Sequence, residues 1–600
     1  MSASGARTHL GATLRDDGAT FRVWAPRCRT VDVVVGGSAP VPLVRGEDDV
    51  FEATLAGVAA GARYYYRLDT ERQRPDPRSR RQPQGVHGPS AVVDPAGFPW
   101  TDGGLRGHAL GDLVVYELHI GTFTAPGTFE AATGRLARLV DLGVTAVELM
   151  PVAEFPGARN WGYDGAHLYA PQSSYGGPRG LRRFVDACHA HGLSVILDVV
   201  YNHFGPEGCY LGEYGPYLTG RRRTPWGDAV NFDGEGSAGV RRHVIDNAAF
   251  WVREFHVDGL RLDAAHAIAD SSPVHVLTEL AEAARAEAAR LGRPVHVIAE
   301  SHDNDRRLVL PRAEGGLGLD AVWCEDFHHA LHRRLTGEAR GYYADYADPA
   351  RLTRALAEGF AFQGEPSAWY GVTRGTPSRD LPGERVVFFA QNHDPVGNRT
   401  RGDRLGALVP FGAVKCAVAL LLAAPAIPLL FMGEEDGETA PFHFFTSFLD
   451  PALTEGARRG RRREFARFGW DDTAPDPALA ATFEASRLHA ALDEVPRHRE
   501  LREYYRAWLS LRREHPALGC GAKEGAHAAW DADGAVLTLA RAAPSGARVR
   551  LVANLSAERR TWAPDAAWRL LLDSEESRFA GGGGAAPLVP WQVSLYDTGG

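Results

Sequence analysis

The stretch GLRLDAAH, residues 259–266, decides the fold class of this chain. Its side chains alternate along an extended backbone, so Leu260 and Leu262 share one face while Arg261 and Asp263 share the other. An apolar segment that ends in charged residues is typical of a barrel strand, because the active sites of parallel barrels gather at the carboxyl ends of their strands. We therefore predict a buried strand with functional side chains at its end.

Seven further apolar segments repeat this pattern, with helical segments between them. They are residues 113–120, 145–151, 194–200, 295–301, 321–326, 386–394 and 428–435. Eight apolar strands alternating with helices predict an α/β protein with a closed (β/α)₈ TIM barrel. The alternative is an open doubly wound sheet, but no G-x-G-x-x-G follows the first strand, and GGLGL at residues 315–319 lacks the strand-then-helix context.

Short β-like pieces flank the barrel pattern at both ends of the chain. We predict a β-sandwich over residues 1–95, a linker over 96–111, the catalytic barrel with inserted loops over 112–515, and a second β-sandwich domain over 516–600. Three consecutive tyrosines at 64–66 would point to opposite faces of a strand, which favours packing over a sugar-binding platform.

The net charge and the scarcity of lysine argue against nucleic-acid binding and against a P-loop nucleotide site. The formal net charge of −9 argues against nucleic acid, which binds to clustered cations. The basic runs at 222–223 and 458–463 are interpreted as solvated helix faces. Only two lysines occur, Lys415 and Lys523, and neither lies in a phosphate-binding G-x-x-x-x-G-K loop.

Cysteine usage and hydropathy predict a cytoplasmic protein without membrane contact. The six cysteines are scattered, with no C-x-x-C pair, and the amino terminus lacks the apolar region of a secretory signal. Residues 416–432 are apolar throughout, but Pro425 and Pro428 interrupt them. We predict a buried helix, a turn and a buried strand there.

Four of the predicted strands end in polar clusters, which a parallel barrel brings to one rim. They are DVVYNH at 198–203, GLRLDAAH at 259–266, Glu300, and QNHD at 391–394. One acid at a strand end is as often a helix cap, whereas four acids with three histidines and an arginine at one rim indicate an active site. The candidates are Asp198, His203, Arg261, Asp263, His266, Glu300, His393 and Asp394.

Asp263 and Glu300 lie in different predicted environments. Arg261 beside Asp263 favours the ionised carboxylate that a nucleophile needs. Glu300 ends the apolar run VHVIA, where partial desolvation raises its pKa and keeps it protonated as an acid. Two such carboxyls flanking a bond form the glycosidase arrangement, and a separation of about 5–5.5 Å implies a retaining mechanism. A buried structural ion pair between Arg261 and Asp263 is the alternative.

Metal and serine chemistry find little support in the sequence. The pairs His189 with His191 and His328 with His329 lack an H-E-x-x-H or Cys/His set, and no G-x-S-x-G elbow is present. We expect no metal and no other cofactor.

The four clusters resemble, in order and in strand position, the signature regions of the α-amylase superfamily, glycoside hydrolase family 13. The resemblance implies that Asp263 is the nucleophile, Glu300 the general acid/base and Asp394 a third carboxylate that stabilises the transition state. It also implies a glucose subsite with Asp198 in support, formed by Arg261, His203, His393 and Tyr163 of NWGYDG. Pro395 replaces the glutamine expected after Asp394, and proline restricts the preceding residue to extended backbone.

Within that superfamily the chain is most similar to the malto-oligosyltrehalose trehalohydrolases, over about residues 21–516. The stretches that carry the likeness are residues 160–178, 226–234, 325–346 and 428–435. It implies hydrolysis of the α-1,4 bond beside a terminal trehalose, which releases trehalose and a shortened maltodextrin. His266 and Ala267 replace the Lys-His of many superfamily members, and a histidine at the first place also fits this group.

The EDFHH segment at 325–329 is our candidate for trehalose recognition. The hypothesis is that Glu325, Asp326, His328 and His329 hydrogen-bond the trehalose unit. A packed loop with a helix cap is an equally weighted alternative.

Two other functions stay open. A glycogen branching enzyme has the same three acids and a similar β-domain, and transfers the glucan to another chain instead of to water. A non-catalytic glucan-binding relative is disfavoured because all three acids are intact. The amino-terminal domain resembles the Ig-like domains found before such barrels and either binds glucan or packs on the barrel. For assembly, we expect a monomer or homodimer.

Overall fold

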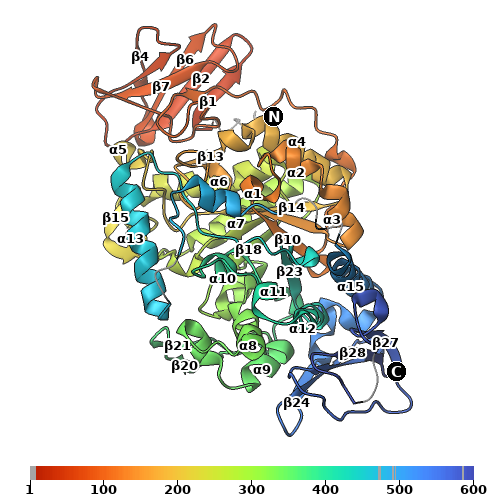
Figure 1. Ribbon diagram of the computed structural model, residues 1–600. Coiled ribbons are helices and arrows are strands. Elements are labelled where there is room, and N and C mark those ends of the chain that lie inside the picture. The colour runs from red at the N-terminus through yellow and green to blue at the C-terminus, as the bar shows by residue number, and fades with distance from the viewer. Residues whose placement is uncertain (1–8, 471–473, 490–491, 493–494, 584–586, 600) are drawn as a thin grey trace.

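Eight parallel strands close into a barrel in the computed structural model, which describes residues 9–470, 474–489, 492, 495–583 and 587–599 (Figure 1). In barrel order they are β10 (Val115–Leu118), β11 (Ala146–Leu149), β14 (Ser194–Val199), β17 (Gly259–Leu262), β18 (His296–Glu300), β19 (Ala321–Trp323), β22 (Val386–Phe389) and β23 (Ile427–Phe431). The last strand pairs with the first, so no strand edge is left open. The predicted TIM barrel is confirmed, with a strand in each of the eight predicted segments.

Helices lie outside the strands, as the apolar character of both strand faces requires. They include α3 (Leu136–Leu142), α4 (Gly177–Ala190), α6 (Ser237–Phe255), α7 (Val276–Leu291), α8 (Glu325–Thr336), α12 (Phe411–Ala423) and α15 (Pro496–Glu514). The alanine-rich sequence of α7 favours helix, and the helix ends where Gly292 adopts the left-handed conformation. The predicted helix, turn and strand at 416–432 correspond to α12 and β23, and no described helix is long and apolar enough to cross a membrane.

Two antiparallel sheets form the amino-terminal domain. One contains β1 (Gly11–Arg15), β2 (Gly18–Trp24), β6 (Val50–Ala56) and β5 (Val44–Arg45). The other contains β4 (Val41–Pro42), β3 (Val31–Val35), β7 (Arg63–Leu68) and β8 (Arg72–Arg74), with β9 (Ser90–Ala91) beside β7. Tyr64 and Tyr66 are buried between the sheets while Tyr65 is half-buried, which is the alternation expected of packing residues.

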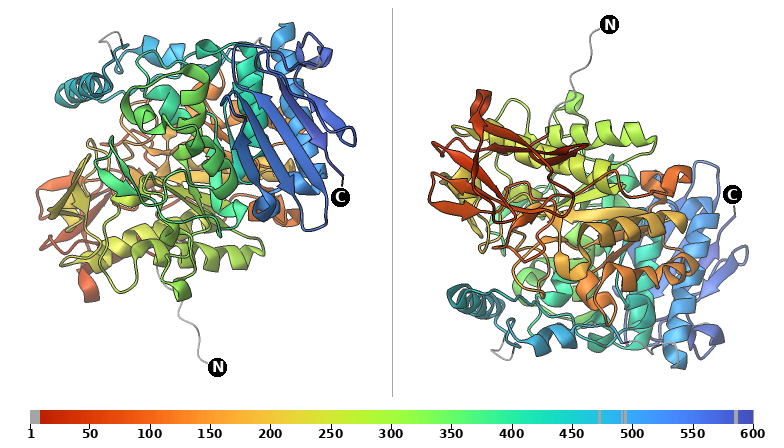
Figure 2. Two further views of the ribbon diagram at one scale, coloured as in Figure 1. Left: turned by 90° about the horizontal axis from the view of Figure 1, so that it is seen from below. Right: turned by 90° about the horizontal axis from the view of Figure 1, so that it is seen from above.

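The carboxyl-terminal domain lies on the opposite side of the barrel from the amino-terminal sheets (Figure 2). Its described strands form one five-stranded antiparallel sheet, ordered β24 (His527–Trp530), β25 (Val536–Ala542), β26 (Arg548–Asn554), β28 (Val593–Asp597) and β27 (Arg569–Asp573). One face joins the main core beside α12, and the other packs on Trp562 and Trp568. The predicted second β-sandwich is therefore a single described sheet, with α12 beside one of its faces. The boundaries at 95, 111 and 515 stay a prediction.

Inserted hairpins follow several barrel strands and surround the carboxyl-terminal rim. They include β15 (Leu218–Thr224) with β16 (Gly227–Val230), and β20 (Glu365–Ser367) with β21 (Val372–Arg374). The basic run at 222–223 therefore lies on a strand, and its interpretation as a helix face was wrong. The run at 458–463 does lie on a helix, α13 (Pro451–Phe468), although Arg461 is mostly buried and donates to Gly397 O.

Candidate active site

Arg261 joins three acids at the carboxyl ends of β14, β17 and β18. Its Nη1 donates to Oδ2 of Asp198 at 2.6 Å and to Oδ1 of Asp263 at 3.0 Å. Its Nη2 lies 3.7 Å from Oε2 of Glu300. The guanidinium is fully buried over the Trp323 ring, whereas 12% of the Asp263 and Glu300 side chains stays exposed. One cation therefore brings the two predicted catalytic acids together.

Asn202 after β14 and the Ala264 N–H after β17 also orient the two acids. Asn202 donates from Nδ2 to Oδ2 of Asp263 at 2.6 Å and to its main-chain oxygen at 2.8 Å. Ala264 has φ of +40°, a left-handed conformation that costs a residue with a Cβ about 1–2 kcal/mol. In that conformation its N–H donates to Oε2 of Glu300 at 2.5 Å. The strained residue thus connects the segment of one acid to the side chain of the other.

Burial dominates the titration of Glu300. It raises the pKa of this carboxyl to about 7; the Arg261 charge opposes the rise, and the nearby carboxylates of Asp263 and Asp394 add to it. Burial likewise raises the pKa of Asp198 to about 6, again against the Arg261 charge. The direction expected for Glu300 from its apolar strand agrees with this environment.

His393 links the third acid to the barrel interior. It begins α10 (His393–Gly397), and its N–H and Nδ1 bond the two oxygens of Glu117 at 3.0 and 2.5 Å. Its Nε2 lies 2.7 Å from the Tyr163 hydroxyl and 3.4 Å from Oδ2 of Asp394. Burial alone would lower the pKa of His393, but the carboxylates of Asp394 and Glu117 raise it to about 9. A protonated His393 therefore donates from both nitrogens and fixes the Tyr163 ring beside it.

Asp394 lies in the first turn of α10, so the expected restriction to extended backbone was wrong. Proline is tolerated at this point because the first N–H groups of a helix have no partner within it. Asn398 donates to Oδ1 of Asp394 at 3.1 Å, and 46% of the side chain is exposed. The carboxylate of Asp394 therefore lines the cavity while it remains partly open to solvent.

The other two predicted histidines, His203 and His266, each contact a neighbouring ring. Nε2 of His203 is 2.9 Å from the Tyr163 carbonyl, and its ring stacks on Trp226 of the β15–β16 hairpin with 4.9 Å between centroids. The His266 ring lies 3.9 Å from that of His302, and burial lowers its pKa.

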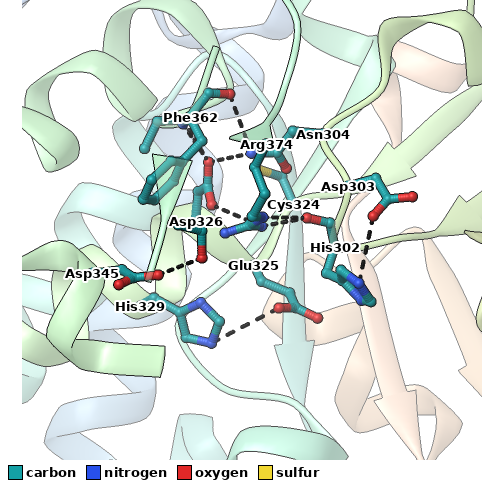
Figure 3. Close-up of polar contacts among 12 residues, drawn as sticks. His302, Asp303, Asn304, Cys324, Glu325, Asp326, His329, Asp345, Phe362 and Arg374 are labelled. Carbon is teal, nitrogen blue, oxygen red and sulfur yellow. Dashed lines mark hydrogen bonds and ion pairs between the residues drawn. The ribbon is translucent and has the colours of Figure 1, made fainter. Parts of the chain in front are cut away.

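The EDFHH segment divides between the cavity and the core. Asp326 is fully buried and accepts hydrogen bonds from Ala361 N, Phe362 N, Asn304 Nδ2 and the Tyr346 hydroxyl (Figure 3). With both oxygens bonded inside the protein, it is no sugar ligand, and we correct that part of the hypothesis. His328 and His329 do reach the cavity, although His328 already bonds Ala390 O and the Tyr343 hydroxyl.

A cavity extends from Glu300 and Asp394 toward α8. It is lined by Glu300, Trp323, Glu325, His328, His329, Tyr342, Tyr370, Phe389, Asn392, Asp394, Pro395 and Asn398. No group of three or more His, Cys, Asp or Glu side chains arranged to hold a metal ion lies among the described residues.

Sequence reasoning missed the acids inside the barrel. Glu117 on β10 and Glu148 on β11 are neighbours in register, and both are buried. The signal was available: each interrupts an apolar strand, VYEL or AVEL, where an acid is rare without a role. Asn202 was also missed, since its bond to Asp263 crosses between strands that only the fold brings together.

Comparison with known proteins identifies both the barrel and the domain before it. Residues 93–215 match the family "Alpha amylase, catalytic domain", and residues 9–85 match "Carbohydrate-binding module 48 (Isoamylase N-terminal domain)". The crystal structure of an amylase-like protein from Salmonella typhimurium superposes with a TM-score of 0.90 at 39% identity, over 98% of this chain and 99% of that one.

Several curated relatives cover most of the chain. The malto-oligosyltrehalose trehalohydrolase of Arthrobacter ramosus is 48% identical over 83% of this chain and 87% of its own length. That of Saccharolobus solfataricus is 44% identical over 86% and 88%. A 1,4-alpha-glucan branching enzyme of Corynebacterium jeikeium is 32% identical, but over only 53% of this chain and 50% of its own.

Proposed function

The chain belongs to the malto-oligosyltrehalose trehalohydrolases, and from that premise we propose that it hydrolyses the α-1,4 bond next to the terminal trehalose of malto-oligosyltrehalose. The products are trehalose and a shortened maltodextrin. The branching-enzyme alternative has weaker support, because that relative aligns with about half of the chain.

We propose a retaining mechanism with Asp263 as nucleophile. A carboxylate oxygen of Asp263 attacks C1 of the glucose at the cleaved bond, while the departing oxygen takes the proton of Glu300. The hydrogen bonds from Arg261 and Asn202 support the first role, because they stabilise an ionised carboxylate and fix its rotamer. The pKa of about 7 supports the second, since Glu300 then holds its proton at neutral pH and below.

In the second half of the reaction, water replaces the departed trehalose. Glu300, now a carboxylate, removes a proton from that water, whose oxygen attacks C1 and breaks the ester to Asp263. The Ala264 N–H bonded to Glu300 stabilises this ionised form between the two steps. Two displacements at C1 return the α configuration.

The remaining residues form the subsite for the cleaved glucose in this proposal. Asp394 holds sugar hydroxyls with its partly exposed carboxylate and stabilises the charge that develops at C1. Protonated His393 and the Tyr163 ring bound the same space, and His203 lies at its edge below Trp226. The free cysteines fit action in a reducing cytoplasm. For the assembly, we propose a monomer or homodimer.

The observation that carries the proposal is the single guanidinium shared by Asp198, Asp263 and Glu300. The test is product analysis with the full chain. We expect free trehalose from malto-oligosyltrehalose and a loss of about a thousandfold or more in kcat for Asp263→Asn. New branch points on amylose without trehalose release would contradict the proposal, and so would an Asp263→Asn variant with unchanged turnover.

A further inference from the structure

One wall of the cavity beside Glu300 has no part in the steps above. This leaving-group wall consists of Glu325, His329, Tyr342 and Tyr370. A general acid must lie within hydrogen-bond reach of the oxygen that departs, so the leaving sugar extends from Glu300 into open space. Arg261 closes the other side of Glu300, because it is buried there and lies 3.7 Å from the carboxyl. The cavity in front of the leaving-group wall is therefore the space open to the leaving sugar.

Glu325 is the acid of that wall, and its hydrogen-bonding capacity is unused. Among the described residues its carboxyl has no hydrogen-bond partner, and the basic atom within ion-pair range is Nε2 of His329 at 4.0 Å. That distance is too long for a hydrogen bond. Burial, with His328 as the next cause, holds the pKa of His329 well below its usual range, so the imidazole is neutral and the two side chains form no ion pair. A side-chain pair within α8 therefore does not account for Glu325.

The adjacent acid shows the opposite arrangement and explains why Glu325 is held in place. In Figure 3 the Asp326 side chain points into a set of bonds with Asn304 and the segment at Phe362, whereas Glu325 points away from it toward His329. Asp326 ties the first turn of α8 to separate loops of the rim. The backbone of Glu325 is therefore fixed while its carboxyl stays available to a ligand.

The chemistry of a neutral carboxylic acid suits a sugar. Burial raises the pKa of Glu325 to about 8, and the Glu300 charge adds to the rise. At neutral pH the group both donates and accepts a hydrogen bond, as a sugar hydroxyl does. It also places no second negative charge beside the general acid. A leaving trehalose presents hydroxyls on two rings, whereas an aryl leaving group presents none.

We propose that Glu325 hydrogen-bonds the leaving trehalose and is a residue that makes the enzyme prefer it. This rests on the proposed function, since it assigns the recognition of that same product. Asp326 then acts as a positioning residue, through the fixed first turn of α8, and touches no substrate.

The test compares two substrates with the same glucan part, malto-oligosyltrehalose and a malto-oligosaccharide with an aryl leaving group. Glu325→Ala is expected to lower kcat/KM for malto-oligosyltrehalose about 10–30-fold, the effect of one or two lost hydrogen bonds. It should leave kcat/KM for the aryl substrate within about twofold, because no leaving-group hydroxyl is lost there. Glu325→Gln, whose amide still donates and accepts, should recover most of the loss. Glu130→Ala, an exposed first-turn glutamate of α2 (Phe129–Thr133), is the control and should change neither value.

Inhibition of aryl-substrate hydrolysis by added trehalose separates this inference from the proposed function. If trehalose inhibits the wild type and Glu325→Ala alike, the role of Glu325 is overturned while the function stands. If trehalose does not inhibit the wild type and is not released from malto-oligosyltrehalose, the function itself fails. An equal loss on both substrates would reduce Glu325 to a structural residue and would also overturn the inference.

Discussion

Replacing Glu300 with glutamine should stabilise the fold, and the gain should grow with pH. Burial raises the pKa of this carboxyl from its ordinary value of 4.5 to about 7. The unfolded chain loses the proton near pH 4.5, whereas the folded chain keeps it to about pH 7. Across that window, ionisation of the unfolded chain therefore lowers the free energy of unfolding. A glutamine resembles the neutral acid and cannot ionise.

The size of the effect follows from the two pKa values. Linkage gives a loss of wild-type stability of about 1 kcal/mol at pH 5 and about 3 kcal/mol at pH 8. The difference in unfolding free energy between Glu300→Gln and wild type should therefore increase by about 2 kcal/mol between these pH values. A fixed offset from the substitution itself cancels in this comparison.

Thermal or urea unfolding of the full chain at pH 5 and pH 8 measures this difference in unfolding free energy between Glu300→Gln and wild type. Glu314→Gln, at an exposed position in the loop region after the same strand, is the control. A Glu300→Gln advantage that stays constant or shrinks as the pH rises would refute the description of Glu300 as a desolvated acid. The variant should be nearly inactive at both pH values, which confirms that the probe is the intended residue.

Two further predictions concern the rim. Above roughly pH 7, kcat/KM should fall about tenfold per pH unit, because Glu300 must be protonated. Asp394→Asn should move this basic limb to lower pH, since the Asp394 charge raises the Glu300 pKa. A limb that does not move would belong to a group other than Glu300. Asp326→Asn should lower the free energy of unfolding by about 1–3 kcal/mol, because it removes the negative charge 3.5 Å from the buried Arg374 guanidinium and replaces the Oδ1 acceptor by an amide nitrogen. For the Asp326→Asn variant, kcat/KM should fall by a similar factor with malto-oligosyltrehalose and with the aryl substrate. A loss confined to malto-oligosyltrehalose would restore Asp326 as a direct trehalose ligand.

The sequence predicts the barrel well because each strand is buried on both faces. Continuous apolar runs such as SVILDVV and VVFF have one compatible environment, and the polar residues that end them all fall on one rim. The carboxyl-terminal domain was less predictable. Its strands alternate as in a sandwich, but whether a sheet or helices cover the second face depends on contacts with α12.

Site residues are predictable where their contacts follow from strand spacing, and not where the contacts join distant segments. Arg261 and Asp263 share a strand face, so the two-residue spacing alone predicts their contact. The role of Asp326 was not predictable, because its partners come from segments that only the fold brings together. The spacing of EDFHH places acids at a helix start but does not show that Glu325 faces the cavity while Asp326 faces the core.

The central claim is that Asp263 forms a covalent bond to the sugar while Glu300 supplies the proton. The most direct test uses Glu300→Gln with a malto-oligosaccharide that carries a 5-fluoro substituent and a fluoride leaving group, because fluoride departs without a general acid and the glycosyl ester then accumulates. Peptide mass spectrometry should find the glycosyl adduct on Asp263. An adduct on another carboxylate, or turnover of this reagent with inversion and no adduct, would contradict the account.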